Sequence, residues 1–301
     1  MPTPATPPVG SPLSPVLLAP GAAGSASFDA TAFAGVLVVV TGLLLLLSHA
    51  TTQSVQPPPA AERTAGLWED EGSDAHEGSQ RGSPATPGAD GSETEPVDQS
   101  SDPLESMSPG LLLANVAVTQ GGFLVVLVGA AVLSDVPASA LGLSPGAFGP
   151  TALLAGAVLG LGLYVANELG AAVADGAGVE YDERLRTVLA PDDARGWVVL
   201  LLLVLPLVAV FEEFLFRAAF VGVLAAGFGL SPWLLAVVSS VLFAVGHGIQ
   251  GPAGVVVTGG LGLVLATAFV LTGSLVTVVL AHYLVNVLEF VVHEGFGVDW
   301  A

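Results

Sequence analysis

Long apolar runs separated by short polar breaks dominate the chain. They occupy residues 31–48, 109–133, 151–172, 197–225, 232–248, 254–271 and 273–293. A helix of about 20 apolar residues crosses the hydrocarbon core of a bilayer, and inside lipid it satisfies its own backbone hydrogen bonds. The pattern predicts an all-α, polytopic transmembrane helical bundle of about seven spans. The run at 232–248 is short, and the run at 197–225 is long enough to tilt or break.

Two segments interrupt this pattern. Residues 1–30 are rich in Pro, Ala, Gly and Ser and are predicted to form a flexible N-terminus. Residues 49–108 contain twelve acidic residues among many Pro, Gly and Ser. Such a segment cannot bury enough apolar surface to fold, so we expect a disordered acidic linker. The chain then divides into a first span at 31–48, this linker, accessory helices with a loop at 109–194, and a helical core at 195–293.

Composition supports a membrane protein and excludes several functions. The mean hydropathy is +0.78, with 52% hydrophobic and 11% charged residues. Twenty-six acids stand against six basic residues, all Arg, which gives a net charge of −20 and leaves no basic surface for nucleic acid. The absence of cysteine excludes disulfides and a thiolate nucleophile. An acidic, lysine-free chain suits a cytosol of very high salt, which predicts a halophilic microbe.

Arginine placement predicts how the bundle is oriented in the membrane. Arg184, Arg186 and Arg195 fall in the loop at 173–196. Because basic residues are enriched in cytoplasmic loops, this loop is expected to face the cytoplasm. Counting back through two spans places the linker on the same side. The chain is therefore predicted to be a multi-pass protein of the cell membrane.

The fourth apolar run carries Glu212, Glu213 and Arg217 at its centre, in "VFEEFLFRAAF". Charged side chains are costly at this depth. Glu213 and Arg217 are four residues apart with the acid first, so they share a helix face and are expected to pair. Glu212 has no local cation, which suits a proton acceptor near neutrality. A purely structural polar cluster is the alternative for all three residues.

Two further polar positions lie on later runs. His247 follows Phe243 by one turn at the end of "FAVGH", where a histidine is commonly interfacial. His282 and Asn286 share a face of the last run and could simply hydrogen-bond to neighbouring helices. Together, a carboxylate, two imidazoles and an amide on three helices can bind and deprotonate a water and hold a developing oxyanion. That set suits amide hydrolysis without a covalent nucleophile.

Three ordered motifs carry a family resemblance. "EEFLFR" (212–217), "FAVGH" (243–247) and "HYLVN" (282–286) resemble the EExxxR, FxxxH and HxxxN motifs of the CAAX protease and bacteriocin-processing (CPBP, Abi-type) family. The resemblance covers about 195–292. It implies a glutamate-dependent intramembrane endopeptidase whose catalytic core is 195–293 and whose cavity opens to the cytoplasm. The substrate it implies is a membrane-associated or CaaX-like protein or peptide.

The same resemblance implies roles for individual residues. Glu212 would be the general base on water, and His247 would help to hold that water. His282 and Asn286 would stabilise the oxyanion. The remaining motif residues would support the site: Glu213, Arg217 and Phe243.

Metal use stays open. The zinc-protease helix signature HExxH is absent. Glu212, His247 and His282 could hold Zn²⁺ with one open position, as the metalloprotease label of the family suggests. They could equally activate water without a metal.

The remaining polar residues are not expected to belong to the site, and two other classes of function stay possible for the chain. Asn167 and Glu168 are expected to be interfacial, Glu289 to face the cavity mouth or solvent, and His293 to have no role. A non-catalytic membrane scaffold or immunity-type partner would keep the polar cluster for packing. An ion-coupled transporter would show internal repeats, and the sequence has none that is evident.

Overall fold

The computed structural model describes residues 28–55, 108–176 and 184–298, and the elements of this part are helical. The main helices are α1 (Ala30–Val55), α3 (Pro109–Leu133), α4 (Pro150–Gly176), α5 (Arg184–Leu189), α6 (Ala194–Val199), α7 (Leu205–Glu213), α8 (Leu224–Phe228), α9 (Pro232–Gly246), α10 (Gly251–Thr272) and α11 (Leu275–Glu289). Short 3₁₀ segments, η1 (Pro145–Phe148) and η4 (Gly248–Gln250), and π-helical segments, η2 (Leu200–Val204), η3 (Phe214–Val223) and η5 (Phe290–Gly295), connect or extend them.

The predicted all-α, polytopic bundle is confirmed. Within the described residues, six helical stretches are long and apolar enough to cross a membrane, and α9 is a shorter apolar helix. These six stretches and α9 correspond to the seven spans predicted from the sequence. The first helix continues to Val55, into the segment predicted as linker, while 1–27 and 56–107 lie outside the described residues.

Local signals fix where several helices begin and end. Ser108 and Ser231 precede Pro109 and Pro232, and each serine oxygen accepts a hydrogen bond from a backbone N–H in the first turn. Serine at the N-cap followed by proline is a favourable helix start. Gly273 ends α10 with a φ of 60°, a left-handed conformation that glycine adopts without strain. The turn at Gly273 leaves only two residues between α10 and α11.

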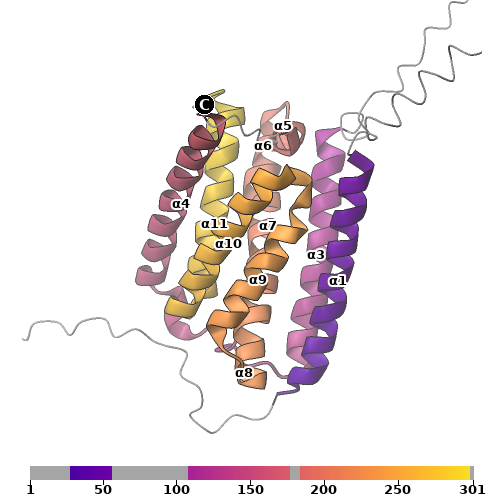
Figure 1. Cartoon of the computed structure of the whole chain (residues 1–301), viewed down its shortest axis with the longest axis vertical. Helices are drawn as coiled ribbons and strands as arrows, with labels where there is room; N and C mark the ends of the chain where they lie inside the picture. Colours follow the sequence, from indigo (N-terminus) through magenta and orange to yellow (C-terminus); the bar gives the residue numbers. More distant parts are fainter. Residues whose placement is uncertain (1–27, 56–107, 177–183, 299–301) are drawn as a thin grey trace, which may run out of the picture.

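The stretch from α6 to α8 is the centre of the bundle. Half of its most apolar window is buried, against 17% for α3 and for α4. Helices α1 and α3 flank it on one side and α4 and α11 on the other, with α9 and α10 in front (Figure 1). The long run does not break; it stays helical and changes to π winding at η2 and η3. Such π segments are rare and often occur at functional sites.

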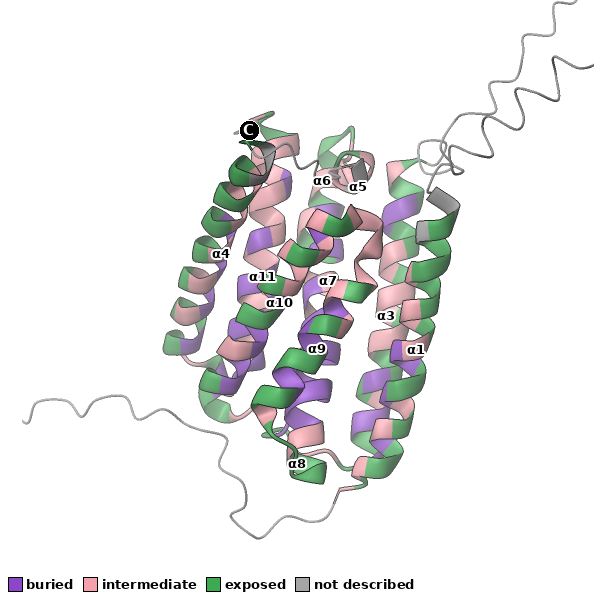
Figure 2. Ribbon diagram, viewed as in Figure 1, coloured by how far each residue is buried: buried purple, intermediate pink, exposed green. Residues whose placement is uncertain are grey.

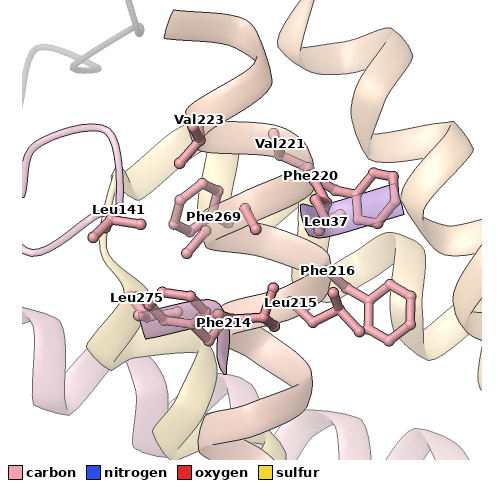
Figure 3. Packing of buried hydrophobic residues seen from close by; sticks show 14 of the residues in the cluster. Leu37, Leu141, Phe214, Leu215, Phe216, Phe220, Val221, Val223, Phe269 and Leu275 are labelled. Carbon is pink, nitrogen blue, oxygen red and sulfur yellow. The ribbon is translucent and has the colours of Figure 1, made fainter. Parts of the chain in front are cut away.

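Apolar packing surrounds η3. Phe214, Leu215 and Phe220 of this segment pack with Phe269 of α10 and Leu37 of α1 (Figure 3). Exposed residues, most of them apolar, cover the outer faces of the peripheral helices (Figure 2). In a soluble protein so much exposed apolar surface would be unfavourable, whereas in a bilayer it is the surface that lipid covers.

Helix α4 approaches α11 through Gly156 and Gly160. A Cβ on Gly160 would lie 2.8 Å from the carbonyl oxygen of Ala281 and 2.9 Å from the Cβ of Leu284. Small residues four apart allow membrane helices to approach this closely. The contact holds α11 in place directly beside His282.

We expect Gly160→Ala to lower the free energy of unfolding by about 1–3 kcal/mol, because the added methyl group overpacks the contact. Gly162→Ala is the matched control, since a Cβ there meets nothing within 4 Å. Thermal unfolding in detergent measures both. If the two variants unfold at the same temperature, α4 and α11 are less closely packed at Gly160 than the structure shows.

One end of the bundle gathers the loops that the sequence placed together. The last turn of α1, the start of α3, α5 and the C-terminal end of η5 lie at this end (Figure 1). We call it the α5 end. The described ends of α1 and α3, between which the predicted linker falls, and α5 from the loop at 173–196 lie at this same end, while residues 56–107 lie outside the described residues. Assignment of this end to the cytoplasm stays a prediction.

Candidate active site

The acidic pair lies at the junction of α7 and the π-helical η3. Glu212 and Glu213 are the last residues of α7, and Arg217 lies in η3. Glu212 is 8% exposed, and Glu213 and Arg217 are fully buried. All three are therefore removed from solvent and depend on partners within the protein.

Arg217 is bound on several sides. Its Nη1 donates to Glu213 Oε1 at 2.9 Å, so the structure brings together the pair that the spacing predicts. Its Nη2 donates to the carbonyl oxygen of Gly262 at 3.0 Å. The guanidinium also lies over the ring of Phe243, 4.7 Å from the centroid, where a cation–π attraction favours it. A buried guanidinium so held is a rigid support for Glu213.

Glu213 also binds His282, a contact that the sequence reasoning missed. His282 Nδ1 lies 2.7 Å from Glu213 Oε1, the same oxygen that accepts from Arg217. The other ring nitrogen, Nε2, lies 3.7 Å from Glu212 Oε2. The two adjacent carboxylates thus flank one imidazole from α11. No spacing rule within one helix could have shown this contact between helices.

Phe243 and His247 form a second unit at the end of α9. His247 caps this helix, and its Nδ1 is 2.7 Å from the carbonyl oxygen of Phe243. The two rings pack with centroids 4.5 Å apart, and Phe243 also meets the edge of His282 at 6.2 Å. The four-residue spacing of FxxxH is thereby explained, since it brings the imidazole onto the backbone and ring of Phe243.

A cavity of about 220 Å³ joins these groups. Phe243, His247, His282 and Asn286 line one part of it, so predicted residues from two of the three motifs, FxxxH and HxxxN, converge there. Glu212 is not among the residues that line it; its Oε2 lies 3.7 Å from Nε2 of His282, which does line it. Arg186 and Glu289 line another part, so the cavity extends towards the α5 end.

A group of polar residues at that end was not predicted as part of a site. Glu289 accepts hydrogen bonds from Asn167 at 2.7 Å and from Arg186 at 3.1 Å. His293 lies 2.9 Å from Glu168. The expectation that Glu289 faces the cavity mouth agrees with the structure, but Asn167 lines the cavity and His293 has a specific partner. The spacing of Asn286, Glu289 and His293 along one helical face was the available signal.

The predicted three-ligand metal set does not form in this arrangement. In the described part of the chain, the group that brings three metal-ligand atoms within 4.8 Å of one another is Glu168, Glu289 and His293. Glu212, His247 and His282 do not form such a group. Glu212 and His282 alone have the proximity that two ligands of one ion would need.

Comparison with known protein families identifies a family that shares this part of the chain. Residues 194–288 match the type II CAAX prenyl endopeptidase Rce1-like family. The match confirms the resemblance drawn from the motifs and runs from α6 almost to the end of α11. Comparisons with curated proteins and with solved structures gave no match. The matched segment contains all seven predicted motif residues, while α1, α3 and α4 lie outside it. The match and the six long apolar helices support an intramembrane endopeptidase in a multi-pass membrane protein.

Proposed function

We propose that the chain is an intramembrane endopeptidase that hydrolyses peptide bonds of membrane-associated or CaaX-like substrates with a water that Glu212 activates and His247 helps to hold. The main support for this proposal is a buried series of contacts that runs from Arg217 through Glu213 to His282 and Glu212. A guanidinium fixes a carboxylate, that carboxylate fixes an imidazole, and the imidazole meets a second carboxylate. Arrangements in which one group orients the next are typical of catalytic sites.

Glu213 acts as the orienting group in this proposal. Its Oε1 accepts from Arg217 Nη1 and binds His282 Nδ1, which fixes the imidazole ring. The opposite nitrogen, Nε2, then points at Glu212 Oε2 across 3.7 Å. Direct hydrogen bonds run about 2.6–3.2 Å, so these two atoms do not bond directly, and both can face a water or a substrate oxygen that lies beside them.

The proposed reaction balances without a covalent enzyme intermediate. The oxygen of the bound water attacks the carbonyl carbon of the scissile peptide, and Glu212 takes the proton that it loses. Asn286 and, in its protonated form, His282 Nε2 donate hydrogen bonds to the oxyanion. As the C–N bond breaks, Glu212 returns its proton to the leaving amine. The products are a carboxylic acid and an amine, which at neutral pH become a carboxylate and an ammonium group.

His247 is proposed to hold the water from the other side of the cavity. The carbonyl oxygen of Phe243 can only accept, so His247 Nδ1 must donate to it, at 2.7 Å. In the neutral ring this leaves Nε2 with a lone pair. That atom can accept a hydrogen bond from a water in the cavity that His247 lines.

A cleavage assay on the purified full-length protein in proteoliposomes tests this function. Substrates are lipid-anchored peptides, CaaX-like prenylated peptides and the same peptides without lipid, and mass spectrometry reads the products. We expect new peptide termini from the lipid-bearing substrates only. Equal cleavage by wild type and Glu212→Gln, or none by either, would contradict the proposal and favour the scaffold.

Zinc held by Glu212, His247 and His282 is the alternative route to an activated water, and it would require His247 to move closer to the other two residues. A zinc ion would supply Lewis-acid polarisation and a more acidic bound water. Cleavage that a chelator abolishes and added Zn²⁺ restores would favour this route. Cleavage that withstands the chelator would favour activation by the side chains alone.

The first helix is expected to position His247. Ser48 of α1 donates its hydroxyl to the carbonyl oxygen of Gly246 at 2.6 Å, next to His247. Ser48→Ala should lower the cleavage rate about fivefold, because a net hydrogen bond is worth about 1 kcal/mol. Thr51→Ala is the control, since that hydroxyl donates to Leu47 on its own helix. Equal rates for wild type and Ser48→Ala would show that α1 does not position the site.

A further inference from the structure

A second cluster of ligand-type side chains lies apart from Glu212 and His282. Glu168 comes from the end of α4, Glu289 from the last turn of α11, and His293 from η5. His293 Nε2 lies 2.9 Å from Glu168 Oε1 and 3.8 Å from Glu289 Oε2. The side chains are 8% exposed for His293 and 16% for each glutamate. These three residues, here called the rim cluster, are therefore convergent and largely shielded from solvent.

Several carboxylates gather around the rim cluster. Arg186 pairs with Glu289 at 3.1 Å and with Glu294 at 3.0 Å, and His293 lies 2.9 Å from Glu168. Carboxylates in a partly buried site are stabilised by nearby positive charge, which a divalent cation would add.

The geometry of the rim cluster also suits a metal ion. One atom from each of the three side chains lies within 4.8 Å of the other two. Imidazole nitrogen and carboxylate oxygen are both ligand types that Zn²⁺ takes, with bonds of about 2.0–2.2 Å. Asn167 and Arg186 both hydrogen-bond to Glu289, at 2.7 and 3.1 Å. Ligand carboxylates in metal sites are commonly held by such outer partners.

We propose that Glu168, Glu289 and His293 form a divalent-cation site, with Zn²⁺ as the preferred ion, at the α5 end of the cavity. The ion links the end of α4 to the end of α11 and η5. Because Glu289 also lines the cavity, the site lies at its mouth rather than beside Glu212. The proposal does not depend on peptidase activity, since it rests on the rim cluster alone.

Zinc binding to the purified full-length protein tests this proposal. The protein is stripped with a chelator, dialysed and titrated with Zn²⁺ by calorimetry, and its thermal midpoint is followed. We expect one site that is tighter than any weak background, and a higher midpoint with Zn²⁺. Glu168→Gln and His293→Gln should each weaken that site at least tenfold and remove the rise in midpoint.

Matched variants separate the rim cluster from other causes of binding. Glu294→Gln makes the same change of charge nearby but outside the ligand set, so it should keep the tight site. Glu212→Gln should keep it too, whether or not cleavage is lost. Co²⁺ bound in place of Zn²⁺ should give visible absorption that His293→Gln alters. Three results would overturn the proposal. They are the absence of a tight zinc site in wild type, a loss of zinc affinity in Glu294→Gln as large as in His293→Gln, or a loss of zinc affinity in Glu212→Gln alone.

Discussion

Glu212→Gln is expected to abolish peptide cleavage while leaving the protein folded. The substitution keeps the shape of the side chain and removes the group that accepts the proton of water. General acid–base catalysis contributes about 10²–10⁴-fold to a rate, so turnover should fall by at least that factor. The carboxylate lies 3.7 Å from His282, beyond a direct hydrogen bond, and little stability depends on it.

The measurement pairs initial cleavage rates with thermal unfolding of the same preparation. Glu294→Gln is a suitable control, because it neutralises a carboxylate at the α5 end that contacts Arg186 and Thr187 instead. It should retain most of the wild-type rate. Turnover of Glu212→Gln at the control rate would remove Glu212 from the mechanism.

Glu213→Gln is expected to lose both stability and activity. The change leaves Arg217 charged and without its carboxylate partner in a fully buried position. Breaking one side of a buried pair costs about 3–5 kcal/mol, which unfolding in detergent would show as a large fall in midpoint. Cleavage should fall as well, because His282 loses the carboxylate that fixes its ring.

A double variant separates these two effects. Glu213→Gln/Arg217→Met removes both charges, and replacing a buried pair with apolar groups is often neutral for stability. We expect the double variant to regain much of the midpoint but none of the cleavage. Recovery of both would mean that Glu213 serves Arg217 alone. An unchanged midpoint in the single variant would show that the two residues are not partners.

The sequence was sufficient for the helices because each span is a continuous apolar run. Lipid requires a spanning segment to satisfy its own backbone, so an apolar run has few conformations open to it. The pairing of Glu213 with Arg217 was equally local, since four residues separate them on one helix face. The π winding of η3 was not visible, because its residues are as apolar as those of an α-helix.

Contacts between helices were beyond the reach of spacing rules. Glu213 and His282 are 69 residues apart, and Ser48 and Gly246 are 198 apart. The kinds of side chain on three separate runs suggested that His247, His282 and Asn286 could converge, and the resemblance to known motifs supported this. The rim cluster lay outside those motifs, so Glu168 and His293 were expected to be interfacial or without a role.

The contacts of Arg217 explain how a charged side chain is stabilised inside the bundle. Arg217 is held by Glu213, Gly262 and the face of Phe243, so its charge is compensated without water. Gly262 allows this approach, since a Cβ there would lie 3.0 Å from the ring of Phe243. The charged pair and the aromatic ring therefore form one rigid support on which His282 and His247 are placed.

The central claim is that Glu212 activates a water that attacks a peptide carbonyl, while His282 stabilises the oxyanion that forms. Cleavage of a lipid-anchored peptide in ¹⁸O-labelled water that also contains hydroxylamine tests it most directly, with mass spectrometry of the products. The account predicts that wild type gives a new C-terminal carboxylate carrying one solvent oxygen, and that Glu212→Gln gives none. A hydroxamate at the new terminus would reveal a covalent acyl-enzyme, and that result, or labelled product from Glu212→Gln, would contradict the account.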